Sequence, residues 1–180
     1  MFDQFTELAK RAVVASQDVA LSMGHDFIGT GHQLIGMAAT AGVAGEVLRE
    51  RGVELSRLRE ETARQLEAAG IPATGGREAK DALSSIGIDV AAIQHQADAT
   101  FGSGAFVYPR PAYDERAKKA LQLSVSEAHE LGREDIDTEH LLLGLLAVGE
   151  GLAFDVLTAL EVDIPELRST ALARSAPPSS

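Results

Sequence analysis

Apolar side chains recur at steps of three and four residues near the start of the chain. The positions that form this pattern are Leu8, Ala12, Ala15, Val19 and Met23. Such steps place the apolar side chains on one face of a helix, so the pattern predicts a helix over residues 6–23. Thr6 is its predicted N-cap, and Gly24 is the residue that we expect to end it.

Three shorter helices are predicted to follow, over residues 32–40, 43–51 and 56–69. Thr30 begins a Thr-x-x-Gln pattern, which is typical of a capping box in which Gln33 is the third helical residue. Gly52 separates the third helix from the fourth, and Ser56 is the predicted N-cap of the fourth. The first part of the chain therefore indicates one unit of four helices.

The second part of the chain repeats this plan. Residues 5–36, FTELAKRAVVASQDVALSMGHDFIGTGHQLIG, align without a gap with residues 113–144, YDERAKKALQLSVSEAHELGREDIDTEHLLLG. One residue is then inserted in the second copy, after which Leu48 matches Leu157. A repeat of this length indicates a duplicated structural unit. We therefore expect an all-α fold in which two pseudo-symmetric four-helix repeats pack together.

The connection between the repeats is longer than a simple linker. Within it, residues 83–104, LSSIGIDVAAIQHQADATFGSG, echo the end of each repeat and predict an inserted half-repeat helix. The last residues, SAPPSS, are typical of a disordered end or an interdomain linker. The expected order is a first repeat, a linker with the extra helical segment, a second repeat and a disordered tail, at residues 1–70, 71–111, 112–172 and 173–180.

The composition excludes several classes of partner. Apolar residues make up 45% of the 180 positions and charged residues 24%, which is ordinary for a globular protein. The net charge of −11 argues against binding to nucleic acid, which normally needs a basic face, and against docking on anionic lipid. No apolar run is long enough to span a membrane, and the N-terminus does not resemble a secretory signal. We expect no nucleic-acid or membrane partner, and a cytoplasmic location.

Few residues offer catalytic chemistry. The chain has no cysteine, so it lacks disulfides, thiolate metal sites and thiol nucleophiles. Its histidines have no carboxylate at metal-site spacing, and Ser16 and Ser124 have no neighbouring base in the sequence. A G-x-x-x-x-G-K-[ST] phosphate loop is also absent, so this sequence is not expected to bind ATP. We expect no metal, no cofactor and no enzymatic activity.

The doubled pattern resembles the Clp N-terminal domain, or Clp repeat domain, of ClpA- and ClpC-type AAA+ unfoldases. The resemblance covers roughly residues 1–70 and 112–172. Its most specific pieces are Ile28-Gly29-Thr30-Gly31-His32 and Ile136-Asp137-Thr138-Glu139-His140-Leu141-Leu142-Leu143-Gly144. It implies an all-α fold of two four-helix repeats related by a pseudo-twofold axis. In such unfoldases this domain does no chemistry; it docks adaptor proteins and captures substrates.

The resemblance also implies a ligand, because Gram-positive ClpC-type members bind phosphorylated arginine at one site in each repeat. The acidic residue of Ile-Gly-Thr-Glu-His is then expected to pair with the guanidinium. Glu139 has this position after Thr138, whereas Gly31 stands there after Thr30. A carboxylate can bind a guanidinium through two hydrogen bonds, and helix N-termini can receive the phosphate. The alternative is that Glu139 only complements the dipole of its helix.

The other polar positions of these motifs have structural interpretations. Thr30 and Thr138 are expected to be N-caps first and ligand-binding residues second. His32 and His140 are expected to pack in the core. The remaining histidines are expected at the surface or at helix ends; these are His25, His95 and His129.

A small basic cluster stands out in this acidic chain. It lies in the first turns of the two long helices and comprises Lys10, Arg11, Arg116, Lys118 and Lys119. We interpret it as a solvated face or as a contact for an anion or an acidic adaptor. Some actinobacterial relatives bind macrocyclic peptide antibiotics near the second residue and the start of the second repeat. The resemblance places Phe2, Tyr113 and Lys118 there, with Tyr113 in place of the usual Phe.

Together these patterns predict a non-catalytic protein-interaction module of the Clp proteolytic system. Its expected partners are ClpC-type unfoldases, adaptors or substrates, with phosphoarginine or cyclic peptides as smaller ligands. Such a module can act as a stand-alone decoy or regulator. The alternative is the N-terminal substrate-recognition domain of a full-length ATP-dependent ClpC-type unfoldase.

Overall fold

The computed structural model describes residues 2–71 and 111–175, and between them residues 85–87, 89, 92, 95, 96, 99 and 100. The first repeat consists of η1 (Phe2–Gln4), α1 (Glu7–Ser22), β1 (Phe27–Ile28), α2 (Thr30–Ala39), α3 (Val43–Glu50) and α4 (Leu55–Ala68). The second consists of β2 (Ala112–Tyr113), α7 (Glu115–Glu130), α8 (Thr138–Ala147), α9 (Leu152–Ala159) and α10 (Ile164–Ser175). The prediction of an all-α fold with two four-helix repeats is therefore confirmed.

The first long helix begins and ends at the predicted Thr6 and Gly24, and the second at Asp114 and Gly132, which the alignment of the repeats matches with them. The Thr6 side chain accepts a hydrogen bond from the backbone N–H of Ala9 at 3.1 Å, and Asp114 accepts one from Ala117 at 2.7 Å. These bonds satisfy N–H groups that have no partner within the first turn. Beyond the other ends, Gly24 and Gly132 have φ angles of +76° and +69°, which glycine adopts without strain.

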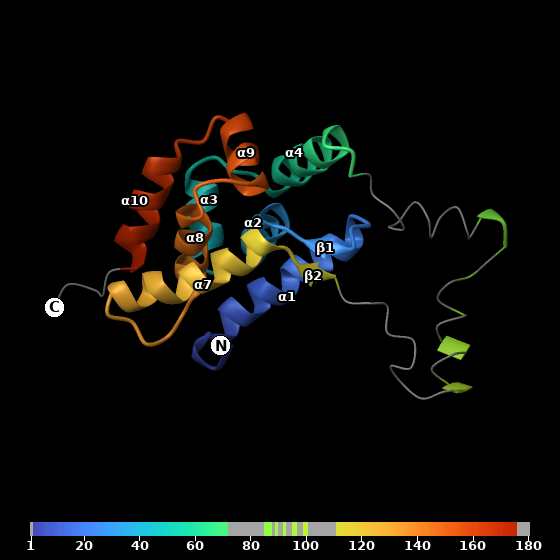
Figure 1. Cartoon of the computed structure of the whole chain (residues 1–180), viewed down its shortest axis with the longest axis horizontal. Helices are drawn as coiled ribbons and strands as arrows, with labels where there is room; N and C mark the ends of the chain where they lie inside the picture. Colours follow the sequence, from blue (N-terminus) through green and yellow to red (C-terminus); the bar gives the residue numbers. More distant parts are fainter. Residues whose placement is uncertain are drawn as a thin grey trace.

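Two glycines allow the first two helices of each repeat to pack closely. α1 lies along α2, and α7 lies along α8 (Figure 1). A Cβ atom at Gly36 would lie 2.8 Å from the backbone N of Ser16, and one at Gly144 would lie 2.5 Å from the carbonyl O of Ala120. Any larger residue at these two positions would therefore push the helices apart.

The shorter helices interlock the two repeats. α3 of the first repeat packs against α8 and α10 of the second, and α9 of the second packs against α2 and α4 of the first. Figure 1 shows the resulting arrangement, with the helices of both repeats around one centre. A single cluster of buried apolar side chains runs through both repeats, so the described helices share one core.

Two short strand pairings also join the repeats in a symmetric way. β1 pairs with β2 in parallel, with Ile28 opposite Tyr113. The duplication matches Ile28 with Ile136 and Tyr113 with Phe5, and these two counterparts form an isolated parallel bridge. Each repeat thus begins by pairing with the loop before the second helix of its partner repeat, as a pseudo-twofold axis requires.

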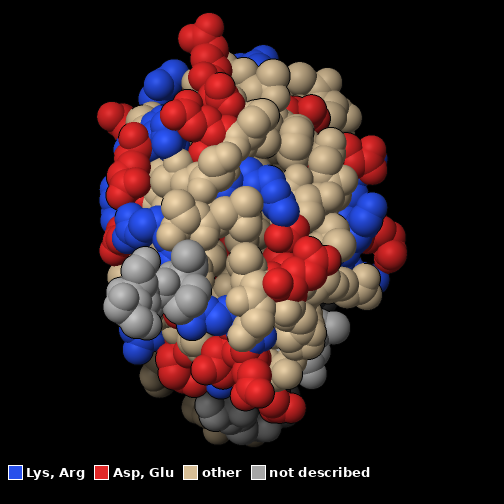
Figure 2. Space-filling model, turned by 90° about the vertical axis from the view of Figure 1, so that its left-hand side faces the viewer, with Lys and Arg blue, Asp and Glu red and all other residues tan. Residues whose placement is uncertain are grey.

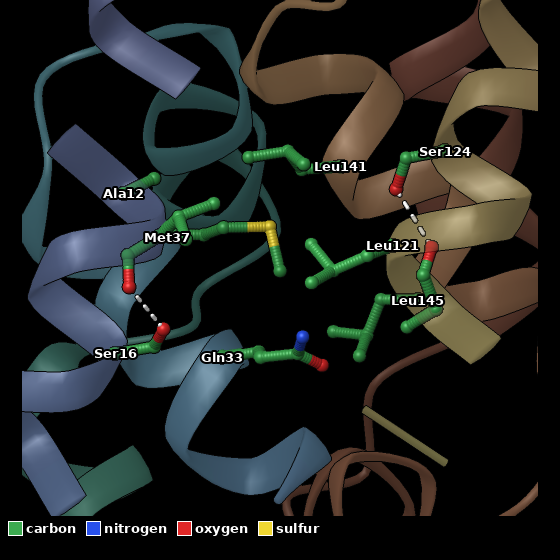
Figure 3. A pocket seen from close by; sticks show the side chains of 10 residues that line it. Ala12, Ser16, Gln33, Met37, Leu121, Ser124, Leu141 and Leu145 are labelled. Atoms are coloured by element: carbon green, nitrogen blue, oxygen red, sulfur yellow. Dashed lines mark hydrogen bonds between the residues drawn. The ribbon is translucent and has the colours of Figure 1, made fainter. Parts of the chain in front are cut away.

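A small cavity lies where the repeats meet, and its lining follows the duplication. Pairs of equivalent residues surround it: Ala12 and Ala120, Val13 and Leu121, Ser16 and Ser124, Gln33 and Leu141, Met37 and Leu145. Figure 3 shows Gln33 as the side chain that breaks this symmetry with an amide. The cavity measures about 10 Å³, room for about one water molecule, so it holds no side chain of a ligand in this conformation.

Three predictions need correction or fall outside the described residues. Ser56 is not an N-cap, because α4 already begins at Leu55 after Glu54. Residues 173–175, assigned to a disordered tail, belong to α10, whose buried Ala171 and Ser175 hold its last turn against the core. The half-repeat helix at 83–104 lies mostly outside the described residues, as does the linker around it.

Within the described residues, no single helix is both long and apolar enough to cross a membrane. Among the described helices, α8 and α9 are together long and apolar enough, but they are bent by 93° relative to each other.

Candidate functional site

The N-terminus of α8 brings together the residues that the sequence singles out. Asp137 is its N-cap, and Thr138, Glu139 and His140 are its first three helical residues. The backbone N–H of Asp137 donates to His140 Nδ1 at 2.9 Å, and the Asp137 carboxylate accepts from the N–H of Thr138 at 2.7 Å. His140 therefore completes the capping box, and Thr138 is a helical residue rather than the predicted N-cap.

The first repeat starts α2 in the same way, so the predicted capping box of Thr30 and Gln33 is also wrong. Gly29 is the N-cap, and its N–H donates to His32 Nδ1 at 2.9 Å. Gln33 instead donates from its amide to the carbonyl O of Ala117 in α7 at 3.1 Å. The N-cap lies one residue earlier than predicted, because a histidine three residues after the N-cap can accept the bond that a Gln or Glu usually accepts.

The two threonine hydroxyls cap helices of the opposite repeat. Thr138 Oγ1 accepts from the N–H of Ala44 in α3 at 3.3 Å, and Thr30 Oγ1 accepts from the N–H of Ala153 in α9 at 3.1 Å. The N-cap residues of α3 and α9 are Gly42 and Gly151, which have no side chain to do this. Thr30 and Thr138 are thus reciprocal caps that connect the repeats.

Replacing Thr138 by Val is expected to lower the free energy of unfolding by about 1 kcal/mol, because the first turn of α3 loses its only side-chain acceptor among the described contacts. Thr138→Ser keeps the hydroxyl and is the matched control. Urea denaturation of the two variants measures the difference. Equal losses for Val and Ser would contradict the capping role.

Glu139 is buried, although it is an acidic residue in the first turn of a helix. Its residue is 6% exposed, and its Oε2 atom has no hydrogen-bond partner. Burial raises the pKa of Glu139, and Asp137 raises it further, whereas its own backbone N–H, Arg133 and Arg174 act in the opposite direction. A buried carboxylate oxygen without a partner is costly, and a bound cation would remove that cost.

Positive and polar groups surround Glu139. Arg174 in α10, which lowers the pKa of Glu139, forms ion pairs with Glu46 and Glu50 in α3, the latter at 2.8 Å. Arg133 donates to the carbonyl O of Ser175 at 3.3 Å. The N-termini of α8 and α3 meet at the hydroxyl of Thr138, the residue before Glu139. The site thus offers one acceptor for a cation and a positive edge for an anion.

The face that carries α10 shows no single sign of charge. Lys and Arg are interspersed there with Asp and Glu (Figure 2). The ion pairs that involve α10 include Arg51 with Glu166 at 2.5 Å and Arg168 with Glu127 at 2.8 Å. Ligand binding at Glu139 would therefore depend on local groups rather than on a broad field.

The equivalent place in the first repeat is filled by Leu152 and by the methyl group of Thr62. A Cβ atom at Gly31 would lie 2.7 Å from Leu152 Cδ2 and 3.1 Å from Thr62 Cγ2. Thr62 is fully buried, and its hydroxyl has no partner. Neither Leu152 nor Thr62 belongs to a motif that predicts a role for it, and the available signal is the alignment of the repeats, which matches them with Val43 and Ala171.

His25 and His32 form a buried pair. His25 lies at a helix end, as predicted, since its backbone N–H donates to the carbonyl O of Ala20 in the last turn of α1 at 2.9 Å, and its side chain is buried rather than at the surface. His25 Nδ1 and His32 Nε2 are 2.9 Å apart, and Phe27 packs against both rings. Since His32 Nδ1 accepts from Gly29, its proton lies on Nε2 and is donated to His25. Burial, and then His25, lowers the pKa of His32 to about 4. His32 and His140 are both buried, as predicted.

The proposed peptide surface of Phe2, Tyr113 and Lys118 remains a prediction. Phe2 is 43% exposed and packs edge-on against Phe5, with ring centroids 5.1 Å apart. The hydroxyl of Tyr113 is buried, and burial raises its pKa. Lys118 is exposed and pairs with Glu115 at 2.9 Å. Phe2 and Lys118 thus contact Phe5 and Glu115, two residues that do not belong to the proposed peptide surface.

The basic cluster is largely paired with acids of the chain itself. Lys10 bonds Glu7 at 2.9 Å, as Lys118 bonds Glu115, and Arg116 bonds Glu150 at 3.3 Å. Among the described residues, no group of three His, Asp or Glu side chains is placed to hold a metal ion.

Comparison with known proteins agrees with the two-repeat fold. The family model of the Clp repeat (R) N-terminal domain matches residues 4–78 and 112–176. The chain is 35% identical over 170 residues to an ATP-dependent Clp protease ATP-binding subunit ClpA homolog from Guillardia theta, covering 94% of the chain and 17% of that protein. It is 33% identical over 172 residues to the negative regulator of genetic competence ClpC/MecB from Bacillus subtilis, covering 96% and 17%.

Solved structures share the fold. The N-terminal domain of the chaperone ClpD from Arabidopsis thaliana superimposes with a TM-score of 0.69 at 23% identity, covering 97% of this chain and 96% of that one. The chain spans about a sixth of the length of the curated relatives named above. Because the family model matches both halves of the duplication, the chain belongs to the Clp repeat (R) N-terminal domain family.

Proposed function

We propose that this chain is a non-catalytic protein-interaction module of the Clp system, and that it binds a phosphoarginine-like group of a substrate or adaptor protein at Glu139. The observation that carries the proposal is the Oε2 atom of Glu139, which is buried without a partner. A guanidinium is the natural complement of such a carboxylate, because it can donate two parallel hydrogen bonds to it.

The surroundings of Glu139 suit the phosphate of such a group. The first turns of α8 and α3 meet at Thr138, the residue before Glu139, and Arg133 and Arg174 are close enough to lower the pKa of the carboxyl group. Helix N-termini and arginines both favour a phosphate. An unmodified arginine would make only the carboxylate interaction, so we expect it to bind more weakly.

Calorimetric titration with phosphoarginine tests the proposal. Binding to the wild-type chain is expected, with a loss of about 10-fold or more for Glu139→Gln, since a charge-assisted pair contributes about 1.5–3 kcal/mol. Glu134→Gln, an exposed acid of the preceding loop, is the control and should bind like wild type. Free arginine is the ligand control. Absence of heat with the wild-type chain would refute the ligand.

The relatives suggest the setting in which such binding acts. They include proteins named as ATP-binding subunits of a Clp protease and as chaperones, and the chain matches about 17% of their length. We propose that the module delivers bound proteins to a ClpC-type unfoldase or competes with the unfoldase for them. Addition of the purified chain to an unfoldase that degrades an arginine-phosphorylated substrate would measure this, and the Glu139→Gln chain should have less effect.

A further inference from the structure

The two repeats differ in a coordinated way at three equivalent positions. Gly31, Thr62 and Leu152 meet at α2, and the alignment of the repeats matches them with Glu139, Ala171 and Val43. The first set lies where α2 meets α4 of its own repeat and α9 of the other repeat. The corresponding helices of the second set are α8, which meets α10 of its own repeat and α3 of the other repeat.

The differences compensate one another in volume. The first set has no side chain on the second helix, but larger residues on its two neighbours; the second set has a long side chain there and smaller neighbours. In the first set, an ideal Cβ at Gly31 would lie 2.7 Å and 2.9 Å from Leu152 Cδ2 and Cγ. A side chain at position 31 and Leu152 therefore cannot occupy this space together, because protein interiors are close-packed.

The backbone itself does not prevent a side chain at Gly31. Gly31 is the second residue of α2 and does not have the positive φ angle seen at Gly24 or Gly42. Glu139 has the same place in α8 and is accommodated there. The neighbours, rather than the conformation of the helix, decide whether this place can hold a carboxylate.

We infer that Leu152, with Thr62 beside it, closes the first repeat to ligand, so that each chain takes one guanidinium-bearing group, at Glu139. The ligand part of this inference rests on the proposed function. The residue that begins the short helix across the interface, Leu152 in α9 or Val43 in α3, then determines which repeat is open.

A packing test needs no ligand. Gly31→Gln alone is expected to lower the melting temperature by about 4–8 °C, since overpacking forces Leu152 out of place. In a chain that already carries Leu152→Val and Thr62→Ala, the same Gly31→Gln change should cost less than half of that shift. An equal cost in both backgrounds would overturn the inference that these residues close the site.

A stoichiometry test then addresses binding. Calorimetry with phosphoarginine should give one ligand per wild-type chain and two for the Gly31→Glu, Leu152→Val, Thr62→Ala variant. Adding Glu139→Gln to that variant should return the number to one, now at the first repeat. Two ligands on the wild-type chain would overturn the inference and leave the proposed function standing. No ligand on the wild-type chain would refute the proposed function, while the packing test still decides whether Leu152 closes the first repeat.

Discussion

Replacing Gly144 by Ala is expected to lower the free energy of unfolding by about 2 kcal/mol. A Cβ at this position would lie 2.5 Å from the carbonyl O of Ala120, and it would also meet the backbone N of Ser124. Backbone atoms cannot move aside as a rotamer can, so α7 and α8 must separate. Overpacking of this kind costs about 3 kcal/mol, and Ala recovers about 1 kcal/mol through its higher helix propensity.

Urea denaturation followed by far-UV circular dichroism measures this loss. Ser126→Ala, on the exposed side of α7, is the control and should change stability by less than about 0.5 kcal/mol. Gly36→Ala is expected to cost less than Gly144→Ala, because its Cβ would lie 2.8 Å from the nearest backbone atom. A Gly144→Ala chain as stable as wild type would show that the helices are not in the close contact described.

The duplication made most of the fold predictable. Residues that act within their own helix, such as the caps Thr6 and Asp114 and the terminal glycines Gly24 and Gly132, lie where the pattern predicts. Their roles depend on the neighbouring few residues, which the sequence shows directly. The three- and four-residue spacing of apolar residues predicted the buried face of α1 in part: Ala12 and Val19 are buried, but the face also includes Ala9, Ser16 and Ala20, which the pattern did not single out.

Predictions failed where a side chain acts across the repeats. Thr30 and Thr138 are of a residue type that is common at N-caps, yet their hydroxyls cap α9 and α3, each of which belongs to the opposite repeat. Nothing local distinguishes the two uses of a threonine. The glycines at the starts of these helices, Gly42 and Gly151, were the available signal, since a helix without a side-chain cap needs an acceptor from elsewhere.

The sequence predicted where the candidate site lies, but not that its carboxylate is buried and lacks a hydrogen-bond partner. The motif around Glu139 indicates a carboxylate at the start of a helix, but its burial and its unpartnered Oε2 arise only in the fold, in which α3 and α10 pack against α8. The closure of the first repeat by Leu152 also requires the packing of α9 on α2. A residue-by-residue comparison of the repeats would have shown the exchanged sizes, but not that these residues touch.

Acid is expected to destabilise the fold through the pair of His25 and His32. The pKa of His32 is about 4 in the folded chain and near 6.5 when unfolded, because burial and His25 disfavour the charged ring. Between these values the unfolded chain binds more protons than the folded one, so stability falls as the pH falls from 6.5 to 4. The full difference is about 3 kcal/mol, present above pH 6.5 and lost by pH 4.

The geometry explains why the folded pair resists protonation. His32 Nδ1 accepts from the N–H of Gly29, and His25 Nδ1 faces the N–H of His32 Nε2. A proton added to either Nδ1 would place two donors against each other. Protonation of His32 Nδ1 would therefore break the capping box that begins α2, one residue before Thr30 and its bond to α9. The acid sensitivity of one imidazole is thus coupled to the junction between the repeats.

Chemical denaturation of wild type and His32→Gln at pH 7, 5.5 and 4.5 measures this contribution. Gln at the third helical position can still accept from the backbone of the N-cap, so the start of α2 is kept while the titrating ring is removed. Glu139 changes stability in the opposite direction, because its raised pKa favours the folded state in acid. Both chains contain Glu139, so the difference between them isolates His32. The variant should lose less stability than wild type on acidification; parallel pH profiles would contradict the assignment.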